Sequence, residues 1–327
     1  MSGGPALTRD NPPLAASLLV GGLFLLGLQD AVIKLTSGDI SLWQMQLIRA
    51  SGNLVLLVLL SRVLWGRMPP WPLRLWAVSL RAFLLTCAML LFFGGVPFLS
   101  LSQIAAGLYV FPLFVAILSA LVLGEHVGPR RIGAVIIGLA GTLLILKPGT
   151  DAFQWVSVMP VGAGLCYAAM ILTTRKLCRD EHPVTAAFAV SVSFIAVGVI
   201  GIVAIWLVAP APELAQSWSY LLTGWNPLQL WVVGLILGCS LLNLTANLSL
   251  TRAYQTAESS WLAPFDYSYL IFATFWGYVV WQHVPDALSF VGMGLIAASG
   301  TYVALREAHL AKQKAKQEQV AEAVGDR

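Results

Sequence analysis

Polar side chains interrupt the otherwise apolar stretch of residues 241–281. Asn243 and Asn247 lie four residues apart, so a helix would place both on one face, and Asp266 follows within the next apolar run. Amides and carboxylates are costly against lipid, and inside membrane spans they usually contact a substrate or an ion. We therefore expect Asp266 to bind polar groups of a substrate or to exchange a proton. The alternative is a carboxylate that caps or packs a helix.

The depth of Asp266 favours the functional role. If its apolar run begins near Ala257, Asp266 lies about 14 Å along the helix, close to the middle of a hydrocarbon core about 30 Å thick. Glu258, at the start of the same run, is expected at the membrane surface instead.

Aromatic side chains flank these polar groups. Trp261, Tyr267 and Tyr269 in this run, and Tyr109 in an earlier one, could stack on a planar or cationic ligand. Aromatic residues in membrane spans also pack between helices or anchor them at the interface, so both roles stay open. Asn247 likewise fits either a ligand contact or a hydrogen bond that holds two helices together.

Charged residues also fall inside apolar runs of the first half of the chain. Asp30 and Arg49 lie about 9 Å and about 12 Å from the outer ends of their spans, so the two could form an ion pair. That pair would either belong to a binding site or be purely structural. Arg81 has no partner nearby in the sequence and, like Lys34, could extend its charge to the membrane surface.

The composition is that of an integral membrane protein. The 327 residues are 58% hydrophobic and 10% charged, with a mean hydropathy of +0.81, too apolar for a soluble surface. The net charge of +4 then concerns orientation and lipid contact rather than a nucleic-acid partner. Four scattered cysteines, without a CxxC motif, indicate packing residues: Cys87, Cys166, Cys178 and Cys239.

Sequence motifs of enzymes are absent. The chain has no HExxH, GxSxG, Walker or GxGxxG motif, so we expect neither an enzyme nor a bound cofactor or metal. The missing nucleotide motif also argues against a pump driven by a nucleotide.

Ten apolar windows are long enough to cross a bilayer. They predict an all-α membrane protein with spans at residues 14–35, 41–61, 73–94, 100–123, 131–147, 155–177, 184–209, 228–251, 257–281 and 286–305. Residues 1–13 and the tail 306–327 are polar, and residues 210–227 form the one long loop between spans.

Positive charges predict the orientation. Lys and Arg gather at alternate connections on one side, which the distribution assigns to the cytoplasm, whereas the opposite connections carry only Lys147. Both termini are therefore expected to be cytoplasmic. The basic residues are Arg62, Arg67, Arg74, Arg130, Arg131, Arg175, Lys176, Arg179, Arg252 and the lysines of the tail.

An internal repeat relates residues 98–127 to residues 254–284, and a Gly-rich span follows each copy. Residues 14–147 and 155–305 then form two five-helix units, and because five is odd, the second unit is inverted. Inverted repeats are typical of secondary transporters, whose site lies near the midplane between the halves. Aligning the copies sets Tyr109 opposite Asp266, which predicts a site lined by spans three, four, eight and nine, with bends at Pro112 and Pro264.

Several stretches resemble the EamA-type members of the drug/metabolite transporter superfamily. They are LQDAVIK around Asp30 and Lys34, the Arg49 region, LSQIAAGLYVFPLFVAILSALVLGEHV from residue 101, and APFDYSYLIFATFWGYVVWQHVPD from residue 263. The resemblance implies ten helices as two five-helix repeats. The second copy departs from the first by reading Trp281-Gln282 where the first reads Gly124-Glu125.

These observations predict a secondary transporter of a small amphipathic metabolite in the bacterial inner membrane, with export as the first choice. The mixed charges favour a zwitterion or a polar aromatic compound, and protons are a candidate coupling ion. Import of a vitamin- or nucleotide-like metabolite is the alternative, and a membrane-embedded enzyme or receptor is the alternative of another class. A duplicated chain can form its pathway as a monomer.

Overall fold

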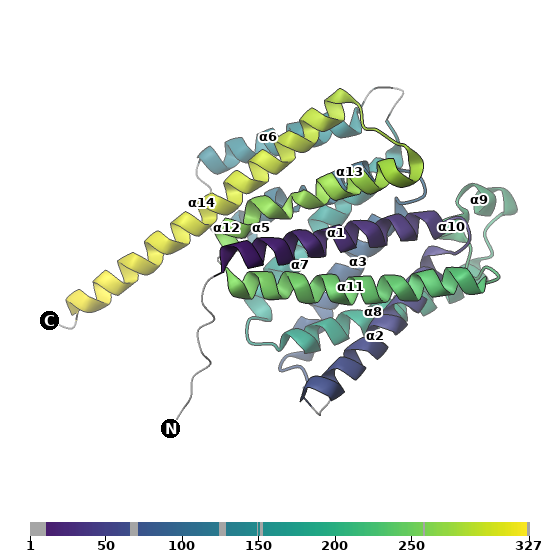
Figure 1. The fold of residues 1–327 in the computed structure, drawn as a ribbon, viewed down its shortest axis with the longest axis horizontal. Helices are drawn as coiled ribbons and strands as arrows, with labels where there is room; N and C mark the ends of the chain where they lie inside the picture. The colour runs from purple at the N-terminus through teal and green to yellow at the C-terminus, as the bar shows by residue number, and fades with distance from the viewer. Residues whose placement is uncertain are drawn as a thin grey trace.

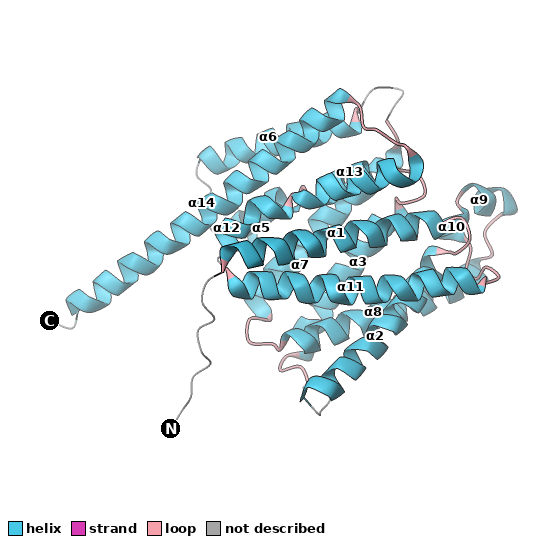
Figure 2. Ribbon diagram, in the orientation of Figure 1, coloured by secondary structure: helices cyan, strands magenta, loops and turns pink. Residues whose placement is uncertain are grey.

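Helices make up all of the regular structure in the residues that the computed structural model describes (Figure 1, Figure 2). The described residues are 11–65, 71–123, 129–148, 150, 153–257 and 259–325. The all-α prediction is therefore confirmed for this part of the chain. Glu258, expected at the membrane surface, lies outside the described residues.

The helices follow the predicted windows closely. In chain order they are α1 (Pro12–Thr36), α2 (Leu42–Trp65), α3 (Leu75–Gly94), α4 (Leu101–Leu108), α5 (Phe111–Leu123), α6 (Pro129–Leu146), the 3₁₀ turn η1 (Trp155–Ser157), α7 (Val158–Leu177), α8 (Pro183–Val208), α9 (Pro212–Ser217), α10 (Ser219–Leu222), α11 (Leu230–Thr256), α12 (Ser259–Asp266), α13 (Ser268–Trp281) and α14 (Ala287–Gly325).

Eight helical segments of the described chain are long and apolar enough to cross a membrane. One of them, Leu101–Val122, combines α4 and α5. A shorter apolar helix covers Ile132–Leu146, and α12 and α13 fill the predicted ninth window in pieces of 8 and 14 residues. The protein is a multi-pass membrane protein.

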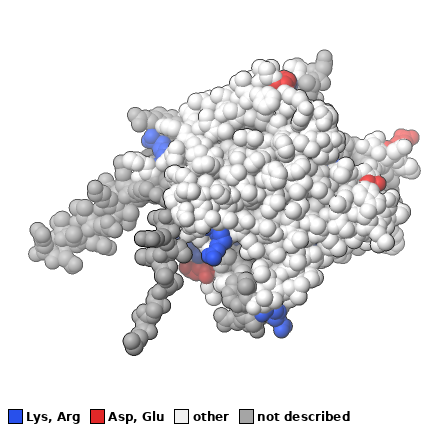
Figure 3. Space-filling model, viewed as in Figure 1, with Lys and Arg blue, Asp and Glu red and all other residues white. Residues whose placement is uncertain are grey.

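The outer surface of the bundle matches that conclusion. A broad uncharged area covers the face seen in Figure 3, with the coloured Lys, Arg, Asp and Glu atoms toward its margins. Large apolar side chains lie exposed along the helices, among them Val55 and Leu59 of α2 and Ile200 and Val203 of α8. Such a surface suits lipid rather than water.

Capping groups define where several helices begin. The side chain of Asn11 accepts a hydrogen bond from the Leu14 N–H at 3.2 Å ahead of α1, and a proline follows in the first turn. A capping box of Ser100 and Gln103 starts α4, because each side chain bonds the other residue's backbone N–H. These local signals lie at the edges of apolar windows, so the sequence contains both the spans and their starts.

Two membrane segments are broken rather than continuous. α4 ends at Leu108 and α5 starts at Phe111, while only Tyr267 separates α12 from α13. Pro112 and Pro264 lie beside these breaks, and a proline removes a backbone donor from the helix. The bends thus occur near both prolines that the sequence singled out, and each break carries a tyrosine.

Helices from opposite halves of the chain pack side by side. α1 packs along α11, α3 along α7, α2 along α8, and α6 along α14. The broken segments are central to this arrangement, since α4 packs on α7 and α13, and α1 packs on both α12 and α13. The core therefore joins the two halves instead of dividing them.

Small residues set the closest of these contacts. A Cβ added to Gly141 of α6 would lie 2.7 Å from the Gly292 oxygen of α14, and one added to Gly292 would lie 2.5 Å from the Gly141 oxygen. The two backbones can approach this closely only because neither residue has a side chain. The close packing predicted for the two Gly-rich spans is confirmed here.

Lys34 corrects one expectation. Its ammonium donates to the carbonyl oxygens of Val96 at 2.6 Å and Leu99 at 2.7 Å, between α3 and α4, and it lies 5.5 Å from the ring of Trp281. The side chain is partly buried and does not reach out to the membrane surface. Both oxygens belong to the connection between α3 and α4, where backbone carbonyls have no helix partner, and Lys34 satisfies them.

The long loop before α11 is itself structured. Trp218, between α9 and α10, packs on Phe98 with ring centroids 4.8 Å apart, and Trp43 of α2 donates to the Leu221 oxygen at 2.8 Å. At the other end of the bundle, α14 continues as one helix to Gly325 and projects beyond the neighbouring helices (Figure 1). The predicted boundary at residue 306 therefore lies within a helix.

Candidate functional site

Two groups of polar side chains lie inside the bundle. We call the first the Arg49 cluster; its members are Gln29, Asp30, Gln46, Arg49, Tyr220 and Tyr269. We call the second the Asp266 cluster; its members are Arg81, Tyr109, Tyr167, Tyr254, Asp266 and Tyr267. Each cluster combines residues from both halves of the chain, so neither could form from one repeat alone.

Asp30 is buried on α1 and held by two hydrogen bonds. The Tyr269 hydroxyl of α13 donates to its Oδ2, and the Gln29 side chain donates to its Oδ1 at 3.2 Å. A carboxylate in an apolar interior must have such donors, because desolvation alone would strongly disfavour its charge. Tyr269 thus fixes Asp30 from a helix more than two hundred residues further along the chain.

Arg49 does not form the direct ion pair with Asp30 that its depth suggested. No Arg49 nitrogen lies within 4.0 Å of an Asp30 oxygen in the described structure, although the two charges are close enough to act on each other. Instead, Arg49 Nη2 donates to Gln46 Oε1 at 2.9 Å. The rings of Phe93 and Phe194 lie 4.7 Å and 5.6 Å from the guanidinium carbon. Cation–π contacts of this kind stabilise a desolvated guanidinium.

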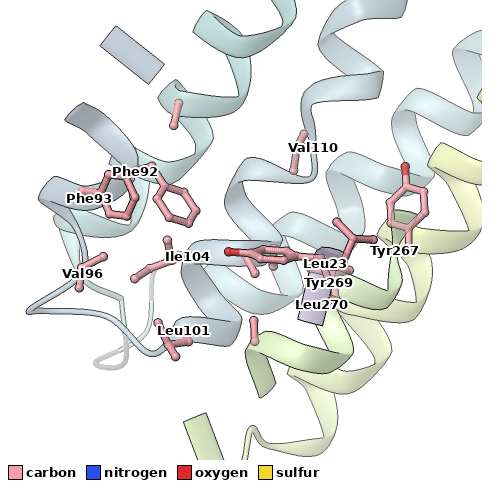
Figure 4. Packing of buried hydrophobic residues seen from close by; sticks show 14 of the residues in the cluster. Leu23, Phe92, Phe93, Val96, Leu101, Ile104, Val110, Tyr267, Tyr269 and Leu270 are labelled. Carbon is pink, nitrogen blue, oxygen red and sulfur yellow. The ribbon is translucent and has the colours of Figure 1, made fainter. Parts of the chain in front are cut away.

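Three tyrosines meet at the two helix breaks. Tyr109 stacks on Tyr269 with centroids 5.2 Å apart and planes 12° apart, and it meets Tyr267 edge to face at 5.6 Å. Figure 4 shows that Tyr267 and Tyr269 point in different directions from their short segment of chain. Tyr269 faces Asp30 and the Arg49 cluster, while Tyr267 belongs to the Asp266 cluster. The stack therefore connects the two clusters.

Asp266 ends α12 and has a single hydrogen-bonding neighbour among the described residues. The Tyr254 hydroxyl of α11 lies 2.7 Å from its Oδ1 and 2.6 Å from its Oδ2. Asp266 is half-buried and Tyr254 is 38% exposed, so both stay accessible to water. Asp266 has no cation in direct contact in the described chain, which leaves its charge without a partner of opposite sign.

Arg81 also differs from its expected position. Its Nε donates to the Thr174 hydroxyl of α7 at 2.9 Å, so it binds a neighbouring helix rather than extending to the surface. Tyr167 of α7 lies within electrostatic range of both Arg81 and Asp266. An arginine and an aspartate therefore face one group of tyrosines without touching each other.

The remaining predicted residues do not join a cluster. Trp261 is 42% exposed and packs on Phe265. Asn247 is exposed, and its amide donates to the Asn243 oxygen of its own helix at 2.8 Å, not to a neighbouring helix. Tyr254 lies seven residues beyond Asn247, on the same face of α11, so this face does reach Asp266.

Five members of the clusters were missed in the sequence, and four of them are Gln29, Gln46, Tyr167 and Tyr254. Gln29 and Gln46 are polar residues in apolar runs beside charged ones, a signal that could have been used. Tyr220 was missed as well, because it belongs to a segment expected to be a loop. Tyr167 and Tyr254 carry no such signal, since tyrosine is common at membrane interfaces. No group of three or more potential metal ligands occurs in the described residues.

Comparison with known proteins finds a family match for the first part of the chain. Residues 13–147 match the EamA-like transporter family. The matched segment is 135 of the 327 residues, and it includes the regions of Asp30 and Arg49 that resemble EamA-type members of the drug/metabolite transporter superfamily. The match is thus to a family of transporters rather than to a family of enzymes.

Relatives extend the similarity beyond the matched segment. The riboflavin transporter of Vibrio cholerae is 28% identical over 192 residues, which span 59% of this chain and 58% of that protein. The pseudopaline exporter of Pseudomonas aeruginosa is 24% identical over 287 residues, covering 86% of this chain and 93% of that one. A crystal structure with 16% identity superposes with a TM-score of 0.56 over 90% of this chain and 98% of the other, which supports the fold alone.

Proposed function

We propose that this EamA-like protein is a secondary transporter that exports a small zwitterionic or polar aromatic metabolite across the bacterial inner membrane by alternating access. One observation carries the proposal. Asp30 and Arg49 are opposite charges, both buried, on consecutive membrane helices of the chain, and they do not neutralise each other directly. Buried charges held apart in this way suit a ligand that carries both signs.

The helix packing supports an inverted repeat. If α1, α2, α3, α4–α5 and α6 correspond to α7, α8, α11, α12–α13 and α14, the contact of α1 with α11 becomes that of α7 with α3. Under the same exchange the contact of α2 with α11 becomes that of α8 with α3, and the pairs α2–α8 and α6–α14 map onto themselves. Two-fold pairing of this kind is expected when two five-helix units enter the membrane from opposite sides.

The helix breaks supply a basis for alternating access. Tyr109 and Tyr267 occupy corresponding breaks in the two units, and discontinuous helices commonly surround the binding site of secondary transporters. The Asp266 cluster keeps accessible side chains, whereas the members of the Arg49 cluster are buried. We infer that the described conformation is closed around the Arg49 cluster and open at the Asp266 cluster. During transport, the Arg49 cluster becomes accessible and the Asp266 cluster becomes buried.

The relatives suggest a direction of transport and a class of substrate for this chain, and both are part of the proposal. The pseudopaline exporter aligns over most of its length, and this favours export. A second candidate is import of a vitamin-like aromatic compound, favoured by the riboflavin transporters and by the Tyr109–Tyr269 stack, which could hold a planar ring. Protons are the proposed coupling ion, because Asp266 has hydroxyl contact but no cation to keep its charge constant.

Transport by the purified chain tests the proposal. The protein is reconstituted in liposomes, and efflux and uptake of labelled amino acids, nicotinate and riboflavin are measured with and without an imposed pH gradient. Export predicts proton-driven movement of at least one zwitterion or aromatic compound out of the compartment that its cytoplasmic face contacts. A chain that moves none of these compounds in either direction would contradict the proposed substrate class.

A further inference from the structure

Buried polar atoms without partners gather around Arg49. The Nε of Arg49, the amide nitrogen of Gln46 and the hydroxyl of Tyr220 form no hydrogen bond, although these residues are exposed by only 3%, 0% and 3%. Unsatisfied buried donors are uncommon, since each costs about 1–3 kcal/mol. Three unsatisfied donors near one guanidinium indicate a binding site for a group that accepts hydrogen bonds.

The three donors share one environment. Gln46 lies one helical turn before Arg49 and already accepts from its Nη2 through Oε1, which leaves the Gln46 amide nitrogen free to donate. Tyr220 lies close enough to Arg49 for the guanidinium charge to act on its hydroxyl. The donors thus come from α2 and α10, and the Tyr220 hydroxyl lies within electrostatic range of Arg49.

Asp30 does not use these donors. Its two oxygens are engaged by Tyr269 and Gln29 on the other side, and it stays beyond direct contact with Arg49. In the Arg49 cluster, the guanidinium of Arg49 therefore uses only part of its N–H groups, and the nearby carboxylate of Asp30 accepts one hydrogen bond on each oxygen. Guanidinium groups bind carboxylates with two parallel hydrogen bonds when such a fork is free.

We propose that Arg49, Gln46 and Tyr220 form the binding subsite for the carboxylate of the transported molecule. Charge balance specifies the rest of that molecule. A carboxylate added to Arg49 and Asp30 would leave one excess negative charge in the interior, which is costly, whereas a zwitterion brings an ammonium group that Asp30 can accept. The subsite therefore selects amino-acid-like zwitterions over simple anions, and this inference rests on the proposed transport function.

The segment around α10 closes this subsite at the end of the bundle away from the termini. Gln44 of α2 donates to the Asn226 oxygen and accepts from the Asn226 N–H, both at 2.9 Å, and Ser41 donates to the Gly224 oxygen at 3.1 Å. These bonds hold the chain that carries Tyr220 over α2. Tyr220, which belongs to α10, is consequently both a donor of the subsite and part of its cover, and Figure 1 shows α10 at the end of the bundle away from the termini.

Matched carboxylates and amides test the subsite directly. Binding of phenylalanine and phenylalaninamide, and of nicotinate and nicotinamide, to the purified full-length protein is measured by titration calorimetry. Each pair differs in the carboxylate alone. We expect phenylalanine to bind at least about ten-fold more tightly than its amide, since a hydrogen bond to a charged group contributes about 1.5–3 kcal/mol.

Two variants and two control variants test whether the preference for the carboxylate depends on Arg49 and Tyr220. Tyr220→Phe removes only a hydroxyl and should weaken phenylalanine binding about ten-fold while leaving the amide unchanged. Arg49→Gln should abolish the preference for the carboxylate. Tyr278→Phe and Arg62→Gln, both at exposed positions, should bind as the unmodified protein does.

Equal binding of phenylalanine and its amide, no binding of phenylalanine, a carboxylate preference equally large for nicotinate, which lacks an ammonium group, or a preference unchanged in Tyr220→Phe would overturn the inference. If Arg49→Gln fails to fold, Tyr220→Phe decides alone. Transport separates the two proposals. Liposomes that exchange labelled amino acids equally with and without the Tyr220 hydroxyl would leave the transport function standing and remove the subsite, whereas the absence of any exchange would remove the function.

Discussion

Tyr269 stacks on Tyr109 with ring planes only 12° apart, while its hydroxyl donates to Asp30. Tyr109 belongs to the break between α4 and α5, and Tyr269 follows the break between α12 and α13. One side chain therefore contacts both a buried charge and the matching break of the other half. Movement of the chain at either break would therefore shift the hydroxyl that donates to Asp30.

Removing the Tyr269 hydroxyl should separate these two roles. Tyr269→Phe keeps the stacked ring but leaves Asp30 with one donor, so the free energy of unfolding should fall by about 1–3 kcal/mol. Tyr109→Ala removes the ring contact instead, and the double variant should cost less than the sum of the two, because the stack and the hydrogen bond share Tyr269. Thermal unfolding in detergent measures all three. Strict additivity would mean that the stack does not position the hydroxyl.

Asp266 is the proposed proton carrier. Asp266→Asn keeps the shape and can still accept from Tyr254, but it cannot ionise. We expect it to fold normally and to lose the dependence of transport on a pH gradient. Asp39→Asn, at the end of α1 after Ser37, is the control and should keep that dependence. An Asp266→Asn protein with an unchanged pH profile would make Asp266 structural and direct attention to Asp30.

Gly300 leaves the space that Tyr267 occupies. A Cβ at residue 300 would lie 1.6 Å from the Tyr267 hydroxyl oxygen and 2.6 Å from its ring carbon, whereas a Cβ at Gly294 of the same helix would meet nothing within 4 Å. Gly300→Ala should therefore destabilise the protein by about 1–3 kcal/mol. Gly294→Ala should be neutral or stabilise it by up to about 1 kcal/mol.

Unfolding midpoints of the two alanine variants give the comparison. Adding Tyr267→Phe to Gly300→Ala removes the atom that clashes most and should recover part of the loss. Equal midpoints for the two alanine variants would contradict the packing of α12 against α14.

Asp286 provides a pH test outside the membrane. Hydrogen bonds from Lys147 and then Ser289 lower the pKa of Asp286 from 3.8 to about 2, and Lys147 Nζ lies 2.5 Å from its Oδ2. Because the folded pKa lies below the unfolded value, the ion pair stabilises the fold above pH 3.8 and is lost as the pH falls through 2.

The effect should be under about 1 kcal/mol, since both side chains are partly exposed. Asp286→Asn should lack this part of the acid dependence, and comparing its unfolding midpoint with that of the unmodified protein between pH 5 and pH 2 measures it. Parallel curves for the two proteins would show that the pair contributes nothing.

Labelling tests the proposed orientation. In a chain whose four cysteines are replaced, a new cysteine at Thr150 should react with a membrane-impermeant maleimide in intact cells, and one at Arg179 should react only after the membrane is opened. The positive charges near α7 and α8 motivate this assignment. The reverse pattern would invert the topology and with it the direction of transport.

The sequence alone determined much of the architecture. Hydropathy is a property of consecutive residues, so the spans, their approximate ends and the membrane class could be predicted before any contact was known. The polar positions Asp30, Arg49 and Asp266 could be singled out for the same reason, because polarity within an apolar run is visible in one dimension. Pro112 and Pro264 likewise indicated the breaks.

Only the tertiary structure decided which of these residues meet. Asp30 binds Tyr269 and not Arg49, and Asp266 binds Tyr254. Tyr220, from a short helix in a loop, lies within electrostatic range of Arg49. Those contacts depend on how far each helix is rotated and tilted. Rotation and tilt are set by packing, such as the approach of Gly141 to Gly292, between residues far apart in the chain. No pattern within a single span contains that information.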